Sequence, residues 1–143
     1  MKRSGACPCQ SWSVFIWTDQ APEALHPRRC DCDHCQAHPS EVLSGPDMRA
    51  EIHTDTGDLT IHTNGDGLAS FYHCATCEAL LAVGRVFDGQ LRGAVNALLL
   101  EHRETLGEAI PIQPRLLSAE EKLARWAGLW GTLAVTRPRP PGG

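Results

Sequence analysis

Apolar and polar residues alternate in short runs along most of the chain, and turn-forming residues separate the runs. An alternation with a period of two, rich in β-branched and aromatic side chains, is typical of strands with one buried face. The pattern predicts strands at residues 12–17, 48–53, 59–63, 69–73 and 80–87. We therefore expect a protein built mainly of β-structure.

The turn residues predict how some of these strands are joined. Asp88-Gly89 lies between residues 80–87 and 90–100, and an Asp-Gly pair between two apolar runs is a strong hairpin signal. Residues 55–58 suggest a second hairpin between 48–53 and 59–63. Residues 90–100 continue as a strand, although their composition also permits a helix. Residues 18–29 contain two prolines and predict a loop.

One helix is expected, near the C-terminus. Ser118 is a good N-cap residue and Glu121 follows three positions later, which is the pattern of a capping box. Leu123, Trp126 and Trp130 then fall on one face of a helix over residues 118–129. We expect one domain over residues 1–132, followed by a disordered Pro-rich tail over 133–143.

Composition and charge narrow the class of protein. The chain has 143 residues, 42% of them hydrophobic, and a formal net charge of −4. Dispersed basic residues and an acidic balance argue against nucleic-acid binding. The longest apolar run is too short to cross a membrane, and no signal peptide precedes the domain, so a cytoplasmic protein is expected. Nothing in the sequence indicates an oligomeric state.

The cysteines carry most of the functional information. Seven are present, in the three short clusters CPC, CDCDHC and CATC. In a reducing compartment, clustered cysteines are more often metal ligands than disulfides. The residues concerned are Cys7, Cys9, Cys30, Cys32, Cys35, Cys74 and Cys77.

Counting ligands gives an assignment to two zinc sites. Zinc prefers four tetrahedral ligands, and a CxxC pair at a strand end directs two sulfurs the same way. The first pair, Cys7 and Cys9, and the last pair, Cys74 and Cys77, together make one closed structural site. The two side chains of a CxC pair in a regular strand would face opposite sides, so CPC must lie in a turn.

The central triplet is left with an open coordination position. Cys30, Cys32 and Cys35 lie within six residues of one another, which is compact enough for one ion. Three protein ligands with one open position are the pattern of a catalytic zinc. His34, inside the triplet, is a candidate proton shuttle.

Other assignments compete with this one. A single zinc ribbon would use CDCDHC and CATC and leave CPC incidental. The second site would be purely structural if His34, His38 or His73 completed it. Disulfides with leftover thiols are a third arrangement, which the expected compartment disfavours.

The order CxC, CxCxxC and CxxC resembles the GFA/CENP-V family, named for glutathione-dependent formaldehyde-activating enzyme and centromere protein V. The resemblance covers roughly residues 4–100 and implies an Mss4-like fold, an antiparallel sheet around zinc. It also implies a structural zinc on the first and last cysteine pairs and a catalytic-type zinc on the triplet. Relatives carry glycine where this chain has Gln10 and Glu78, which predicts that these two turns close differently here.

The resemblance implies a zinc-dependent carbon–sulfur lyase type of reaction, in which glutathione or another small thiol adds to formaldehyde or a related aldehyde. Arg28 and Arg29 are candidate contacts for a glutathione carboxylate. The alternative hypothesis is a non-catalytic binding module that zinc stabilises. His34 and Gln36 replace the serine and arginine common in the family beside the open zinc, so the substrate is predicted less closely than the metal.

Overall fold

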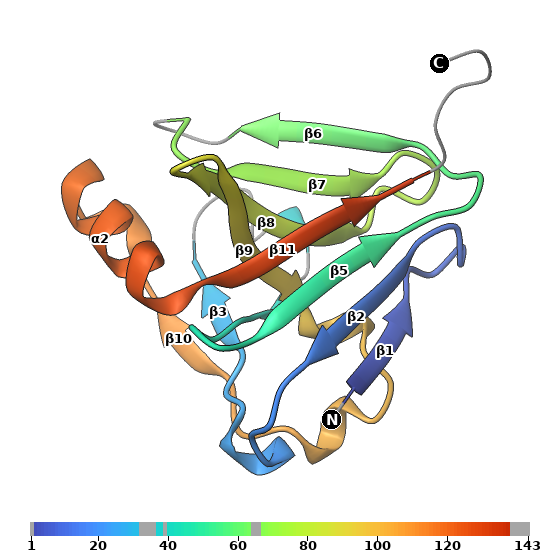
Figure 1. Cartoon of the computed structure of the whole chain (residues 1–143), viewed down its shortest axis with the longest axis horizontal. Coiled ribbons are helices and arrows are strands. Elements are labelled where there is room, and N and C mark those ends of the chain that lie inside the picture. The colour runs from blue at the N-terminus through green and yellow to red at the C-terminus, as the bar shows by residue number, and fades with distance from the viewer. Residues whose placement is uncertain (1, 32–36, 39, 64–66, 138–143) are drawn as a thin grey trace.

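The computed structural model of this chain describes residues 2–31, 37–38, 40–63 and 67–137. Over these ranges the protein is mainly β, with one α-helix packed at one side of a large sheet (Figure 1). Three strands are short: β3 (Arg28–Cys30), β4 (Val42–Leu43) and β10 (Ile110–Ile112). The longer strands are β1 (Lys2–Ala6), β2 (Ser13–Trp17), β5 (Arg49–His53), β6 (Leu59–Thr63), β7 (Ser70–Cys74), β8 (Leu80–Phe87), β9 (Gln90–Asn96) and β11 (Gly131–Thr136).

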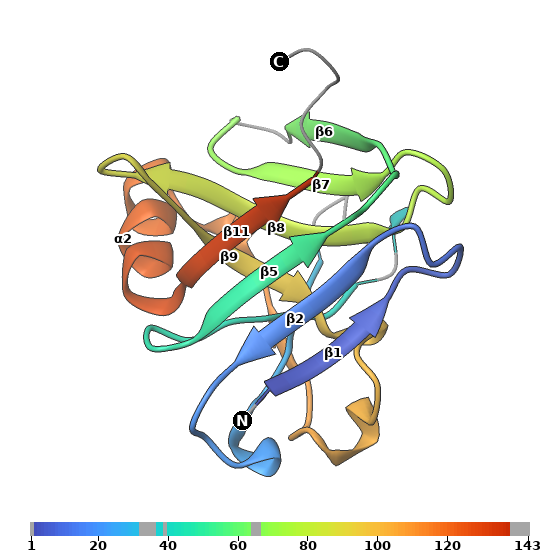
Figure 2. The same ribbon diagram turned by 45° about the vertical axis from the view of Figure 1, so that its right-hand side comes forward.

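The sheet forks at β9. One edge of β9 pairs with β8, which continues through β7 to β6. The other edge pairs with both β11 and β4. From β11 the sheet continues through β5 and β2 to β1, and from β4 it continues through β3 to β10. Figures 1 and 2 show the resulting layers, in which β1, β2, β5 and β11 lie side by side.

The expected fold class, mainly β with a C-terminal helix, is confirmed, and the sheet is mixed, because two of its strand pairs are parallel while the others are antiparallel. β11 runs parallel to β5, and β10 runs parallel to β3. Each parallel pair joins segments that are far apart in the sequence, so local turn signals did not predict it.

Alternation along the central strands builds the core. Val14 and Ile16 of β2 and Ile52 of β5 are completely buried, while the residues between them face outward. They pack with Trp12 and Leu133 in one apolar cluster. This period-two burial is what the sequence pattern predicted, and it fixes the register of these strands.

The predicted strands at 59–63 and 80–87 are confirmed with the same bounds, and so is the hairpin at Asp88-Gly89. Asp88 and Gly89 both have positive φ, 50° and 80°, as a tight two-residue turn between twisted strands requires. The predicted hairpin at 55–58 is wrong: β5 pairs with β2 and β11, and β6 pairs with β7.

The strand that was expected over 90–100 ends at Asn96, and no α-helix replaces it. Asn96 Oδ1 accepts a hydrogen bond from the Leu98 backbone N–H at 3.1 Å and starts a 3₁₀ turn, η2 (Ala97–Leu99). A second turn, η3, follows at Arg103–Thr105. Residues 18–29, expected as a loop, contain the 3₁₀ turn η1 (Pro22–Ala24) and the beginning of β3.

Helix α2 (Ala119–Leu129) begins where the capping box predicted. Ser118 Oγ accepts from the Glu121 backbone N–H at 3.1 Å, and the Glu121 carboxylate accepts from the Ser118 N–H at 3.0 Å. The 3₁₀ turn η4 (Pro114–Leu116) precedes the helix. Trp126 and Trp130 stack with ring centroids 4.7 Å apart, which places the end of the helix against the sheet.

The domain extends further than expected, because β11 runs through Thr136 between β5 and β9. A disordered tail beginning at residue 133 is therefore wrong for residues 133–136, and residues 138–143 lie outside the described residues. In the described ranges, no helix is both long and apolar enough to cross a membrane.

Candidate metal centre and adjoining pocket

Two β-hairpin turns bring four cysteines together. Cys7 and Cys9 lie in the turn between β1 and β2, and Cys74 and Cys77 lie in the turn between β7 and β8. Their four sulfurs all lie within 4.8 Å of one another. Cys9 and Cys74 are 65 residues apart in the sequence, so a metal ion held here would join the first hairpin to the second half of the chain.

The sulfur geometry fits a tetrahedral ion. Cys9 Sγ lies 3.6 Å from both Cys7 Sγ and Cys74 Sγ. Four sulfurs at about 2.3 Å from one ion would be separated by about 3.8 Å. Four thiolates are a soft donor set of the kind that zinc and iron accept in this geometry. The grouping expected from ligand counting is therefore confirmed as a candidate metal site.

Backbone hydrogen bonds shape the first turn around its sulfurs. The Cys7 N–H donates to the Trp12 carbonyl at 3.1 Å, and the Trp12 N–H points at Cys7 Sγ at 3.4 Å. The Gln10 N–H closes the turn on the Cys7 carbonyl at 2.8 Å. Trp12 is fully buried, and its indole N–H donates to the Asp58 carbonyl at 2.9 Å. CPC thus lies in a turn, as the side-chain argument required.

The second turn closes in a similar way. The Glu78 N–H donates to the Cys74 carbonyl at 2.9 Å, and the Cys74 N–H donates to Ala79 at 3.0 Å. The ring Nδ1 of His73, which is buried, lies 3.0 Å from the Glu78 carbonyl. Since a carbonyl oxygen can only accept a hydrogen bond, Nδ1 carries the proton, and this hydrogen bond from the ring stabilises the turn.

The prediction that Gln10 and Glu78 close their turns differently is wrong. Gln10 has φ 62° and Glu78 has φ 65°, so both residues adopt the left-handed conformation that glycine favours. Each turn keeps the backbone path of a glycine turn and holds a side chain in a strained conformation.

Replacing Glu78 by glycine should therefore stabilise the metal-loaded protein by about 1 kcal/mol. The left-handed conformation costs a residue with a Cβ roughly 1–2 kcal/mol, and glycine does not have this cost. Glycine's greater freedom in the unfolded chain offsets part of the gain. Denaturant unfolding of Glu78→Gly measures the effect. Glu78→Ala is the matched control, because it removes the same carboxylate and keeps the Cβ. A glycine variant no more stable than the alanine variant would rule out backbone strain at this position.

The four thiols differ in how readily they ionise before a metal binds. Burial raises the pKa of Cys7 to about 12 and also raises the pKa of Cys74. Hydrogen bonding to Ser11, whose Oγ lies 3.1 Å from Cys9 Sγ, lowers the pKa of the exposed Cys9 to about 6. Cys9 therefore ionises more readily than Cys7 and Cys74, and metal binding must release protons from these two buried sulfurs.

Of the central triplet, the structure describes Cys30, a partly buried cysteine at the end of β3. Cys32, His34 and Cys35 lie outside the described residues. His38 is described, and its ring lies 4.7 Å from that of His73, measured between centroids. The ring of His62 lies 5.1 Å from His73 on the same basis, so His73 contacts other rings as well as the second cysteine turn.

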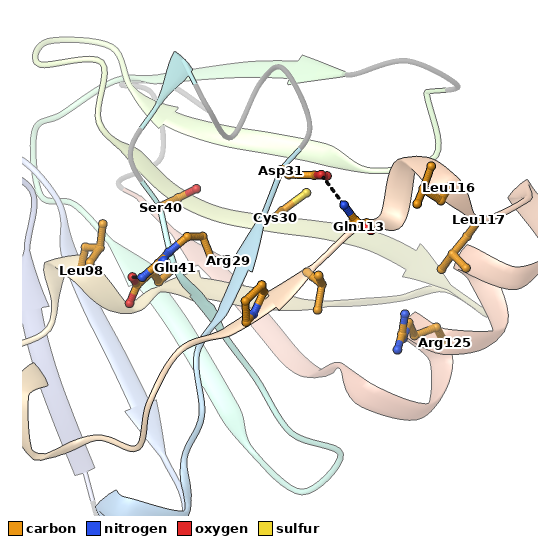
Figure 3. Close-up of a pocket in the computed structure, with 12 residues that line it drawn as sticks. Arg29, Cys30, Asp31, Ser40, Glu41, Leu98, Gln113, Leu116, Leu117 and Arg125 are labelled. Carbon is orange, nitrogen blue, oxygen red and sulfur yellow. Dashed lines mark hydrogen bonds and ion pairs between the residues drawn. The ribbon is translucent and has the colours of Figure 1, made fainter.

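Cys30 lines a pocket with a volume of about 830 Å³. This is within the usual range for small-molecule sites. Figure 3 shows Cys30 and Asp31 in the middle of the pocket, with Leu98 at one end and Arg125 at the other. Its walls come from β3, β10, η4 and α2 and from the segment leading into β4; the lining residues are Arg29, Cys30, Asp31, Ser40, Glu41, Leu98, Pro111, Ile112, Gln113, Leu116, Leu117 and Arg125.

Polar side chains in the pocket are held in place by one another. Arg29 donates to the Glu41 carboxylate at 2.8 Å, and the Gln113 amide donates to Asp31 Oδ2 at 3.2 Å. The sequence singled out Arg29 but not Gln113 or Arg125. Both of these follow the last cysteine by more than thirty residues. The parallel pairing of β10 with β3 brings Gln113 to the pocket, and α2 brings Arg125.

Comparisons with known proteins support the fold and no more. No protein-family model matches the chain, and no curated protein matches it. A crystal structure of a Rhodobacter sphaeroides protein, solved as a structural genomics target, is similar with a TM-score of 0.56. It is 23% identical in sequence, and the match covers 76% of this chain and 99% of that one.

Proposed function

We propose that this protein is a zinc-dependent enzyme of the carbon–sulfur lyase type, which adds a small thiol such as glutathione to formaldehyde or a related aldehyde. In this proposal Cys7, Cys9, Cys74 and Cys77 hold a structural zinc, and Cys30, Cys32 and Cys35 hold a second one. The observation that carries the proposal is the position of Cys30, which lines a ligand-sized pocket while four other cysteines form a group of their own.

The proposed reaction needs a thiolate and an acceptor for its proton. The thiol sulfur forms a bond to the carbonyl carbon, the carbonyl π bond breaks, and the proton lost by the thiol ends on the new hydroxyl oxygen. A zinc ion bound at the triplet would favour the thiolate at neutral pH. A reducing compartment such as the cytoplasm would keep the cysteines free to bind metal.

The chain's own groups would orient the reactants. The Gln113 amide fixes the Asp31 carboxylate next to Cys30, and the ion pair between Arg29 and Glu41 lies on the same pocket wall. Paired in this way, these charges place fixed dipoles around the reacting atoms without reorganising during the reaction. The volume of the pocket suits a thiol much larger than formaldehyde.

The proposal is tested with Cys30→Ser in an NMR exchange assay of glutathione with formaldehyde. Wild-type protein loaded with zinc should accelerate adduct formation, and Cys30→Ser should lose at least a hundredfold of that acceleration, since a serine hydroxyl is a poor zinc ligand. The variant should also lose one zinc per chain and keep the zinc of the four-cysteine site. Full activity with an unchanged zinc content in Cys30→Ser would refute the proposal.

A non-catalytic, zinc-stabilised binding module is the second candidate. The four-cysteine group favours it, because a complete set of thiolates joining two hairpins needs no chemistry to be useful. The same assay separates the two candidates. Wild-type protein that retains its structural zinc and produces no acceleration fits the binding module and excludes the enzyme.

A further inference from the structure

Among the described residues, Arg125 has no carboxylate partner at its end of the pocket. Arg125 reaches the pocket from α2, and Arg28 of β3 lies close enough that the charge of Arg125 contributes to lowering its pKa, after the larger effect of burial. Within the described part of the chain, no carboxylate forms an ion pair with either arginine. A guanidinium in a pocket without such a partner favours an anionic ligand.

The acidic side chains of the pocket do not supply that anion. Glu41 is 2.8 Å from the Arg29 guanidinium, and Asp31 accepts from the Gln113 amide at 3.2 Å. In Figure 3 both lie away from Arg125, toward Leu98 and Cys30. The end of the pocket at α2 is therefore the end that attracts an anionic ligand.

The wall beside Arg125 is apolar. Leu116 and Leu117 lie on the same side of the pocket as Arg125 in Figure 3. Ile112 also lines the pocket and is the register partner of Cys30 in the pairing of β10 with β3. Leu116 is 63% exposed, which is unusual for a leucine in a pocket lined with other apolar side chains. A ligand with a hydrocarbon body would cover this surface and gain free energy from it.

We propose that this pocket binds an aliphatic carboxylate, with the carboxylate on Arg125 and the hydrocarbon chain along Ile112, Leu116 and Leu117 toward Cys30. The binding does not depend on the reaction proposed above. If that reaction is correct, the preferred thiol or aldehyde also carries a terminal carboxylate on an aliphatic chain.

Calorimetry on the full-length, zinc-loaded protein tests the binding with straight-chain acids that contain no thiol. Affinity should rise with chain length from propionate to octanoate, by up to about fourfold for each added methylene group, as burial of apolar surface predicts. Hexanoate should bind about tenfold more tightly than 1-hexanol, because the arginine makes a charge-assisted hydrogen bond only to the acid.

Two variants test which side chains contact the carboxylate of the ligand and which contact its hydrocarbon chain. Arg125→Gln should remove the preference for hexanoate over 1-hexanol. Lys122→Gln is the matched control, because Lys122 carries the same charge on the same helix and does not line the pocket. This control should keep the preference. Leu116→Ser should flatten the dependence on chain length and leave the fold intact, because Leu116 is exposed and lies outside the buried core.

Equal affinity for hexanoate and 1-hexanol, or a preference that survives in Arg125→Gln, would overturn the proposal, and so would the absence of saturable binding by every acid. These outcomes are separate from the fate of the enzyme proposal. If the protein binds acids and does not accelerate thiol addition, the binding site is supported and the proposed reaction is refuted. If it accelerates thiol addition and does not bind acids, the reaction is supported and the binding site is refuted.

Discussion

Cys74→Ser should abolish tight metal binding at the four-cysteine site and lower the free energy of unfolding by about 4 kcal/mol or more. Cys74 is fully buried at the end of β7, and its sulfur lies 3.6 Å from that of Cys9. Structural zinc sites contribute folding energy of about 10 kcal/mol in small domains, so losing one of four thiolates removes a large share of it. Thermal unfolding should show a midpoint about 15 °C lower, and metal analysis should show one ion fewer per chain.

Ala75→Ser is the matched control for this prediction. It introduces the same hydroxyl group in the same turn, at an exposed position that supplies no sulfur. Its unfolding midpoint and metal content should equal those of the wild type. A Cys74→Ser protein that keeps both values would show that the four sulfurs do not hold a metal that stabilises the fold.

Asn96→Leu should lower the free energy of unfolding by about 3 kcal/mol, although the two side chains have similar volumes. Asn96 is buried at the end of β9, where its amide donates to the Leu80 carbonyl at 2.9 Å. Its oxygen accepts from the backbone N–H groups of Glu41 and Leu98. Leucine leaves these groups without a partner, and each buried unsatisfied group costs about 1–3 kcal/mol. Denaturant unfolding measures the loss.

Gln90→Leu provides the comparison, because it makes the same amide-to-leucine change at the exposed start of the same strand. Its effect should be within about 0.5 kcal/mol, as is usual for surface substitutions. Equal effects of the two substitutions on the free energy of unfolding would mean that the hydrogen bonds of Asn96 to Leu80, Glu41 and Leu98 do not stabilise the fold.

Local patterns predicted those parts of the fold that local chemistry determines. The strand at 80–87, the Asp88-Gly89 turn and the capping box of Ser118 and Glu121 each depend on neighbouring residues, and each is confirmed. β11 shows where this approach fails. It pairs in parallel with β5, about eighty residues earlier, and its short sequence after a helix looked like the beginning of a tail.

The candidate metal centre was predictable for a different reason. Ligand count and turn geometry restrict which cysteines can share an ion, so Cys7, Cys9, Cys74 and Cys77 could be grouped without knowing the sheet order. The pocket beside Cys30 could not be predicted in this way. Gln113 and Arg125 reach it through a parallel strand pair and a helix, and neither residue type carries a local signal for such a position.

At Gln10 and Glu78 the residue type did not predict the backbone conformation of the turn. The absence of glycine predicted different turns, and the chain nevertheless adopts positive φ at both positions. Hydrogen bonds from their own N–H groups to Cys7 and Cys74 hold both residues there. The need to direct two sulfurs toward one point outweighs a strain of roughly 1–2 kcal/mol.

X-ray absorption spectroscopy at the zinc edge tests the central claim most directly, which is that four cysteines from two hairpins hold one metal ion. Cys30→Ser is the protein to use, so that a metal on the central triplet does not contribute to the spectrum. The account predicts one zinc per chain with four sulfur ligands at about 2.3 Å. A first shell with fewer than four sulfurs, or protein that retains no zinc after purification, would contradict it.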